Sequence, residues 1–339
     1  MTMDPEAATG VDRVPHGSSD DPDVLDFSAN TNPAVPEGAR EVYADAFDAA
    51  RTYPAEPPDA YRDAAAAVVG CDAADVVPTP GGLAAIRLGI ETTVTAGDSV
   101  LVPKPSFAEY AREVRLQGAE PTFVAHDAVL DADPSAHALV VLCTPNNPTG
   151  DCADPERLRA FAARCRAAGT PLLVDEAFLG YTDTPSLAGT EGVMVARSLT
   201  KLYGLPGIRA GYAVAVGDLR ERLLGARRTW NLGRPALAVG THCLDRTDFV
   251  AETRRRVAAE RERLRDALDA AGYDVHPSDA PFLLLDVGDR TVDAVVAGAR
   301  ERGVAVRDAT TFRGLDAHVR VAVRRPAEND RLVEVLADV

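Results

Sequence analysis

One lysine of this chain stands in a setting suited to covalent chemistry, Lys201 in the segment Ser198-Leu-Thr-Lys201-Leu-Tyr-Gly-Leu-Pro-Gly-Ile-Arg209. Lys104 and Lys201 are the only lysines among 36 basic residues. A lysine amine forms Schiff bases with aldehydes. Ser198, through its hydroxyl, and Arg209, through its planar guanidinium, can both bind a phosphate. The segment therefore indicates a site for a phosphorylated aldehyde, against the simpler alternative of a solvated lysine in a loop.

Two motifs upstream of this segment could contact the same ligand. Pro80-Gly81-Gly82-Leu83 opens a helix-like run, and glycines at a helix N-terminus let backbone N–H groups approach a phosphate. Phe107 follows a strand-like run and could stack on a flat heterocycle. Each signal is weak alone, because Pro-Gly-Gly is more often a turn and a single phenylalanine is more often core.

Two further motifs follow strand-like runs. Thr144-Pro-Asn-Asn147-Pro-Thr-Gly150 comes after the apolar run 138–143, and ligands of open α/β sheets bind beyond the carboxyl ends of strands. Asn147 can donate to a phenolate oxygen, and the 147–148 bond is a candidate cis peptide. Asp175 ends another run, where a buried carboxylate can keep a pyridine nitrogen protonated, although a helix N-cap is its alternative role. The five motifs together predict pyridoxal 5′-phosphate as the cofactor.

Composition excludes several other classes of function. With 52 acidic against 36 basic residues the net charge is −16, which argues against nucleic-acid partners and anionic membrane surfaces. This balance is typical of a cytoplasm adapted to high salt. The five cysteines have no paired spacing, so neither a disulfide framework nor a metal site is expected. No long apolar run or signal-peptide core is visible, and a cytoplasmic protein is predicted.

The pattern of apolar runs predicts two domains within the 339 residues. From about residue 59, helix-length segments alternate with short apolar runs at 100–102, 138–143, 171–174, 193–196 and 212–216. Alternation of this kind predicts an α/β fold with a mainly parallel sheet. We assign residues 45–235 to this large, cofactor-binding domain.

The remainder of the chain differs in pattern. A long charged helix is expected at 251–271, followed by strand-like runs at 282–287, 304–307 and 319–323 and a closing helix from Glu328. These elements predict a smaller α+β domain, formed by residues 236–339 together with an N-terminal arm, residues 1–44.

With these motifs in this order, the chain resembles the fold-type I pyridoxal-phosphate enzymes, specifically the class I/II aminotransferase group, from about residue 16 onward. The resemblance implies a homodimer with its site at the subunit interface. It implies that Lys201 is the Schiff-base lysine and Asp175 the partner of the ring nitrogen. The other implied cofactor contacts are Asn147 to the ring oxygen O3′, Phe107 on the ring face, and Ser198, Arg209 and the backbone of Gly82 and Leu83 at the phosphate. Tyr53 would reach the neighbouring subunit's phosphate, and Arg320 would hold the substrate carboxylate.

Within this group the chain is similar to two subfamilies, L-threonine-O-3-phosphate decarboxylase of cobalamin biosynthesis and histidinol-phosphate aminotransferase. The segments around His16 and 26–33, Phe178 in place of a tyrosine, and the pair Arg320 and Arg324 favour the decarboxylase. A small phosphorylated amino acid is then the expected substrate. By this resemblance Asn32 and His16 should lie near it, with its phosphate bound by Arg313 or Arg324; a turn asparagine and an exposed arm histidine are the structural alternatives.

Overall fold

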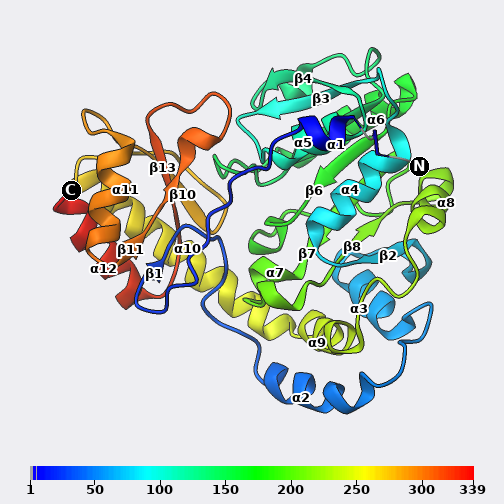
Figure 1. The fold of residues 1–339 in the computed structure, drawn as a ribbon, viewed down its shortest axis with the longest axis horizontal. Coiled ribbons are helices and arrows are strands. Elements are labelled where there is room, and N and C mark those ends of the chain that lie inside the picture. Colours follow the sequence, from blue (N-terminus) through cyan, green and yellow to red (C-terminus); the bar gives the residue numbers. More distant parts are fainter. Residues whose placement is uncertain (1–2, 5) are drawn as a thin grey trace.

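The computed structural model describes residues 3–4 and 6–339 and has two lobes connected by one long helix, α10 (Figure 1). The N-terminal arm and the large lobe contain α1 (Ala7–Gly10), β1 (Leu25–Asp26), α2 (Ala39–Ala49), α3 (Asp59–Val69), β2 (Val76–Thr79), α4 (Gly82–Thr93), β3 (Ser99–Lys104), α5 (Glu109–Leu116), β4 (Glu120–Ala125), β5 (Leu139–Cys143), α6 (Pro155–Ala168), β6 (Leu172–Asp175), β7 (Val193–Ser198), α7 (Leu199–Leu202), β8 (Gly211–Val214), α8 (Gly217–Ala226) and α9 (Arg234–Leu244). They are followed by α10 (Thr247–Ala270), β9 (Asp274–Val275), β10 (Phe282–Asp286), α11 (Val292–Glu301), β11 (Val304–Ala305), β12 (Arg307–Asp308), β13 (His318–Ala322) and α12 (Pro326–Ala337).

The large lobe is built on a seven-stranded sheet of order β2-β8-β7-β6-β5-β3-β4. Its strands run parallel except β8, which is antiparallel to both β7 and β2. The mainly parallel sheet predicted from the sequence is thus confirmed, and each of the five predicted runs overlaps a strand. The prediction missed β2 and β4, which are the two edges of the sheet. Each contains a proline, and β4 is only partly buried, so neither forms a purely apolar run.

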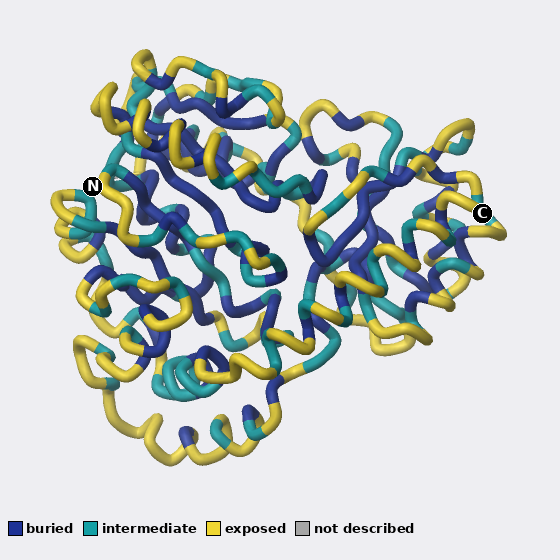
Figure 2. The backbone as a smooth tube through the Cα atoms, turned by 180° about the vertical axis from the view of Figure 1, so that it is seen from behind, coloured by how far each residue is buried: buried dark blue, intermediate teal, exposed yellow. Residues whose placement is uncertain are grey.

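Side chains of the central strands alternate between two hydrophobic clusters, one on each face of the large sheet. Val140 and Leu142 of β5 point into the cluster covered by α3, α6 and α9. Val141 of the same strand points into the cluster covered by α4, α5 and α8. Figure 2 shows these strands in dark blue inside an outer layer of half-buried and exposed helices. Burial on both faces explains why the central strands are recognisable as continuous apolar runs.

The small lobe contains an antiparallel sheet of order β12-β13-β10-β9, packed against α10 and α11, and α12 packs on these two helices. The N-terminal arm is attached to this lobe, because β1 pairs in parallel with β11 and places Leu25 opposite Val304. The helix expected at 251–271 is α10, and the closing helix expected from residue 328 begins two residues earlier, at Pro326.

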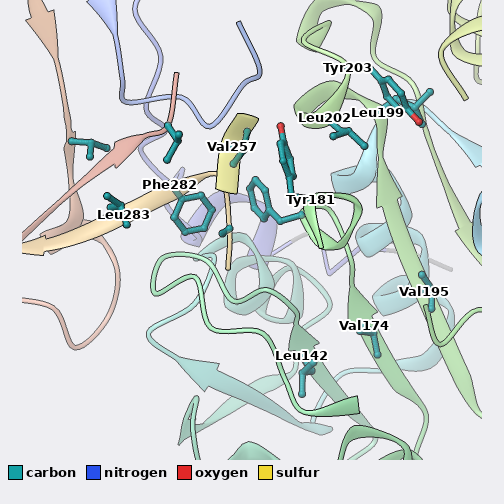
Figure 3. Close-up of a cluster of buried hydrophobic side chains, with 14 of the residues drawn as sticks. Leu142, Val174, Tyr181, Val195, Leu199, Leu202, Tyr203, Val257, Phe282 and Leu283 are labelled. Carbon is teal, nitrogen blue, oxygen red and sulfur yellow. The ribbon is translucent and has the colours of Figure 1, made fainter. Parts of the chain in front are cut away.

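The hydrophobic core is continuous between the lobes (Figure 3). One cluster runs from Leu142 and Val174 of the large sheet to Val257 of α10 and Phe282 of β10, with Tyr181 between them. The lobes are therefore joined by packed side chains as well as by the chain itself. None of the helices within the described residues has the length and apolar character needed to cross a membrane.

Candidate active site

A cavity of about 260 Å³ lies where the two lobes meet the arm, at the carboxyl ends of β5, β6 and β7. The large lobe contributes Lys201 and the ends of these strands. The small lobe contributes Arg307, Phe312 and Arg320, and the arm contributes residues 14–17 and 28–30. Residues from three distant parts of the sequence therefore surround one space.

Lys201 lies in this cavity on α7, the short helix that follows β7. Burial and the charges of Arg320 and Arg209 together lower the pKa of Lys201 to about 8, against the opposing effects of Asp175 and Asp26. An amine with this pKa is partly unprotonated near neutral pH, which is the form that attacks an aldehyde. The position and the pKa of Lys201 both suit the predicted role.

The predicted phosphate residues meet at the N-terminus of α4. Gly82 is the first residue of this helix, and Ser198 and Arg209 line the cavity beside it. Gly81 has a φ of +93°, and a Cβ on it would lie 2.5 Å from Nη2 of Arg209, so only glycine leaves room here. Among the described residues Arg209 donates only to neutral oxygens, those of Pro206 and Pro80 at 3.2 Å each. A helix N-terminus, a hydroxyl and a guanidinium without a carboxylate partner fit a bound phosphate.

Asp175, the last residue of β6, is buried at the floor of the cavity. Tyr110 donates its hydroxyl to Oδ2 at 2.6 Å, and the backbone N–H of Ala177 donates to Oδ1 at 3.0 Å. Burial raises the pKa of Asp175, and these two hydrogen bonds oppose the shift. Among the described residues no arginine, lysine or histidine forms an ion pair with it. A buried carboxylate that lacks a cation fits a protonated ring nitrogen. Tyr110 had been given no role from the sequence, although it follows Phe107 by three residues.

Arg320 connects the small lobe to the loop after β5. Its Nη1 donates to Oδ1 of Asn147 and its Nη2 donates to the backbone oxygen of Ser28 at 3.0 Å. Burial lowers the pKa of Arg320 to about 9, with a further contribution from the charge of Arg307. Its Nε atom is buried without a hydrogen-bond partner. The guanidinium therefore still has a donor for a ligand. The cis peptide bond of this loop lies at Thr144–Pro145, and not at the 147–148 bond that we had expected.

Phe107 and His16 form one wall of the cavity, with their ring centroids 5.8 Å apart. Nε2 of His16 lies 2.9 Å from Oε1 of Glu109, a buried carboxylate on α5. This contact helps to hold the arm against the large lobe. The structure thus brings His16 into the cavity, as expected for a residue near the substrate.

Asn32 and Arg324 were expected near the substrate, and the structure places neither of them on the cavity wall. Asn32 is buried behind Lys201, where its Nδ2 donates to the backbone oxygen of Leu202 at 2.8 Å and its Oδ1 accepts from Arg256 at 2.6 Å. Arg324 donates to the backbone oxygen of Asp26 at 3.0 Å. Both side chains hold the arm and the lobes together in this conformation.

Two other predicted residues also lie outside the cavity. Arg313 stacks on Phe123 at 4.4 Å and lines a neighbouring groove. Tyr53 is 72% exposed and stacks on Trp230, with ring centroids 4.3 Å apart. An exposed position is what a residue that reaches a second subunit would have.

Among the cavity residues that the sequence prediction missed are Arg307 and Asn30. Arg307 lies on β12, where it donates to the backbone oxygen of Pro15 at 2.7 Å and to Oγ1 of Thr311 at 2.9 Å. Burial lowers the pKa of Arg307. Asn30 is buried, and its Oδ1 has no hydrogen-bond partner. Arg307 is the last residue of the strand predicted at 304–307, and this position at a strand end could have marked it as a site residue. Asn30 lines the cavity whereas Asn32, two residues later, bonds to Leu202 and Arg256 behind it, a difference that the sequence pattern does not reveal.

Comparison with known proteins agrees with this geometry. A sequence profile described as aminotransferase class I and II matches residues 22–336. Histidinol-phosphate aminotransferase 2 of Archaeoglobus fulgidus is 30% identical over 329 residues, which cover 94% of each chain. A proposed threonine-phosphate decarboxylase of Caldanaerobacter subterraneus subsp. tengcongensis is 31% identical over 294 residues, covering 81% of this chain and 79% of the relative. Histidinol-phosphate aminotransferase is the more frequent name among such relatives.

The fold is likewise shared with solved structures. The histidinol-phosphate aminotransferase of Sinorhizobium meliloti, in complex with pyridoxal 5′-phosphate, superposes with a TM-score of 0.85 at 22% identity, covering 93% of this chain and 90% of that chain. The fold-type I prediction is therefore confirmed. Relatives of both predicted subfamilies are about equally similar to this chain, so similarity alone does not separate the two activities.

Proposed function

Because this chain belongs to the class I and II aminotransferase family, whose cofactor is pyridoxal 5′-phosphate, we propose that it acts as a lyase on a phosphorylated amino acid. The proposed reaction converts L-threonine O-3-phosphate into (R)-1-aminopropan-2-yl phosphate and CO₂, a step of cobalamin biosynthesis. The observation that carries this proposal is the pair formed by Arg307 and Arg320 in the cavity.

The cavity contains more arginines than the phosphate group of the cofactor needs. Within the described part of the chain, Arg209, Arg307 and Arg320 are the arginines that line it. Arg209 lies with Ser198 and Gly82, where the cofactor phosphate is expected. Two arginines remain for the substrate. Threonine phosphate carries a carboxylate and a phosphate at the same time, whereas histidinol phosphate carries a phosphate alone.

Neither of these two arginines is neutralised within the described residues. Arg307 donates to Pro15 and Thr311, and Arg320 to Asn147 and Ser28, all of them through neutral oxygens. Burying two like charges without a counter-ion is unfavourable, and a ligand with two anionic groups relieves it. The arrangement supports a doubly anionic substrate, with its carboxylate at Arg320 and its phosphate at Arg307.

The residues of this chain also suit the chemistry. When bound, pyridoxal 5′-phosphate supplies an electron sink for the bond that breaks at the substrate Cα. Arg307 and Arg320 fix both ends of the substrate and so set its rotation about Cα, which decides whether the carboxylate or the Cα proton departs. In decarboxylation, Nζ of Lys201 delivers the proton that replaces CO₂ on Cα. In amino transfer, the same atom removes the proton from Cα instead.

Histidinol-phosphate aminotransferase is the alternative function. It is supported by the relative that is 30% identical over 94% of both chains. In that reaction Arg307 or Arg320 would bind the phosphate of histidinol phosphate, and the same pair would bind the two carboxylates of glutamate. The two functions therefore use the same residues on different substrates.

One pair of assays distinguishes them. The purified protein, with pyridoxal 5′-phosphate at high salt, is incubated with L-threonine O-3-phosphate while CO₂ release is followed. A parallel sample receives histidinol phosphate and 2-oxoglutarate, and glutamate is measured. We expect CO₂ and no glutamate. Glutamate without CO₂ would reject the decarboxylase and establish the aminotransferase.

We further propose that the active unit is a homodimer in which Tyr53 reaches the cofactor phosphate of the partner subunit. Its exposure and its stacking on Trp230 support this role, because both rings lie outside the cavity of their own chain. Tyr53→Ala should weaken cofactor binding, and a chain with Lys201→Ala mixed with one carrying Tyr53→Ala should form hybrid dimers with one intact site. Equal cofactor affinity of wild type and Tyr53→Ala would contradict this role.

A further inference from the structure

A groove of about 650 Å³ opens beside the catalytic cavity and contains an unusual concentration of positive charge for so acidic a chain. It is lined by Arg13 of the arm, Arg112 and Arg115 of α5, and Arg313 of the loop before β13. We refer to these four residues and the space between them as the arginine groove. Groove and cavity share five lining residues, which are Val14, Pro15, Phe107, Ala108 and Thr311. The two spaces therefore adjoin each other at these residues.

Most of the positive charge in the arginine groove is uncompensated. Arg112 pairs with Glu113 at 3.2 Å and lies 3.6 Å from Glu109. Among the described residues, the other three arginines form no ion pair with a carboxylate. Arg313 stacks instead on the ring of Phe123, with its Cζ atom 4.4 Å from the ring centroid. Asp12 is the one carboxylate among the described residues that lines the groove.

The location of this charge matters because the chain as a whole has a net charge of −16. A substrate with a phosphate group is repelled by such a surface, and a local positive region at the entrance offsets the repulsion. At about 1 M salt the screening length is only about 3 Å, so guanidinium groups that touch the phosphate matter more there than long-range attraction. Arginines suit this contact, since their planar donors bind phosphate in pairs.

We propose that the arginine groove is a second anion-binding site, which takes the phosphate of a phosphomonoester before the ester enters the catalytic cavity. The identity of the ester rests on the proposed function, but binding of a phosphate in the groove does not. Arg115 and Arg313 are the residues that form this site, because they approach it from opposite lobes and neither is engaged by a carboxylate.

Direct binding tests the site without reference to activity. The holoenzyme is titrated calorimetrically with inorganic phosphate at constant ionic strength, as wild type and as the double variant Arg115→Gln/Arg313→Gln. A matched control, Arg159→Gln/Arg255→Gln, removes two exposed arginines that lie outside both spaces. We expect two phosphates per chain in wild type and control, and one in the groove variant. Equal stoichiometry and affinity in all three proteins would overturn the proposal.

Kinetics with the proposed substrate form the second arm. For L-threonine O-3-phosphate, kcat/KM should fall about tenfold in the groove variant, the loss expected for charge-assisted hydrogen bonds to phosphate, and should stay constant in the control. If wild type shows no activity on this ester while phosphate binding is still lost in the groove variant, the groove stands and the proposed function fails. Should the double variant not fold, Arg115→Gln and Arg313→Gln alone are each expected to weaken phosphate binding about threefold, and unchanged binding in both would again overturn the site.

Discussion

Arg307 and Arg320 lie directly opposite each other in the antiparallel pairing of β12 with β13. Residues in this position on neighbouring strands point to the same face of a sheet, so both guanidinium groups enter one cavity from a rigid support. Like charges at such positions destabilise a sheet. Their presence at the cavity, with only neutral oxygens as partners in the part of the chain that the structure describes, is the clearest mark in this fold of a site made for anions.

Arg307→Gln should therefore affect a phosphorylated substrate far more than its unphosphorylated analogue. Loss of charge-assisted hydrogen bonds predicts a fall in kcat/KM of about 10- to 100-fold for L-threonine O-3-phosphate. Steady-state rates for that ester and for L-threonine measure the difference. Arg302→Gln, which removes an exposed arginine five residues earlier, is the control. An equal loss on both substrates would refute the assignment of the phosphate to Arg307.

Lys201→Ala should lose the visible absorbance that the bound cofactor owes to this lysine. Turnover should fall at least about 10³-fold, because the residue that transfers the proton at Cα is gone. Lys104→Ala is the matched control, since Lys104 is exposed at the end of β3 and does not line the cavity. An absorbance spectrum and a rate measured on each variant suffice, and a wild-type spectrum for Lys201→Ala would be incompatible with its role.

Tyr110→Phe should shift the acid limb of the pH–rate profile. Burial already raises the pKa of Asp175, and the hydrogen bond from Tyr110 counteracts that rise. Without the hydroxyl the pKa of Asp175 rises further, so the carboxylate form that pairs with a cationic ring is lost at a higher pH than in wild type. We expect kcat/KM to begin its decline at higher pH in the variant. A shift toward lower pH would contradict this electrostatic role.

Asp151→Asn should weaken the contact between the lobes. Asp151 follows the Asn147 loop and accepts from His126 at 2.7 Å and from His276 of the small lobe at 3.1 Å. Burial alone would raise the pKa of Asp151, but the two histidine hydrogen bonds outweigh it and lower that pKa. The hydrogen bond to Asp151 in turn raises the pKa of His276.

The signs of these shifts define the pH range of the effect. A histidine with a raised pKa stabilises the fold below its ordinary pKa of about 6.5, and this contribution disappears as pH rises through the folded value. Because the pKa of Asp151 is lowered in the folded protein, its contribution to stability is lost as the pH falls into the acid range. The wild type should therefore be more stable than Asp151→Asn by roughly 1 kcal/mol at most, because both groups are partly exposed. This difference in stability should be largest around pH 6. Thermal unfolding across pH, with Asp131→Asn as an exposed control, measures it. A difference that is constant with pH would exclude histidine titration as its cause.

Much of the site followed from the sequence because its residues sit at the ends of buried strands. Asn147, Asp175 and Ser198 follow continuous apolar runs, and the carboxyl ends of neighbouring parallel strands lie at one edge of the sheet. The sheet order of the large lobe and the two edge strands did not follow, since both edge strands contain a proline and β4 is also partly exposed.

The substrate side was harder to predict, because it depends on how the small lobe and the arm meet. Arg307, Arg313 and Arg324 are equivalent in the sequence, yet only Arg307 lines the cavity. The cause is register: β12 places Arg307 opposite Arg320, whereas Arg324 lies beyond the end of β13 and turns back to the arm. The register between two short strands depends on packing against residues that are distant in the sequence. A local sequence pattern carries no information about that packing.

The pairing of β1 with β11 ties the arm to the small lobe, and the hydrogen bond from Arg307 to Pro15 adds a second tie close to His16. Any rotation of the small lobe must then carry the arm with it as one rigid unit. Against the large lobe this unit is held near the cavity by the contact between His16 and Glu109, by the hydrogen bond from Nε of Arg112 to the backbone oxygen of Asp12 at 3.1 Å, and by the hydrogen bond from Arg320 to Asn147. Separating this unit from the large lobe would thus require several contacts to break together, two of which lie on α5, at Glu109 and Arg112.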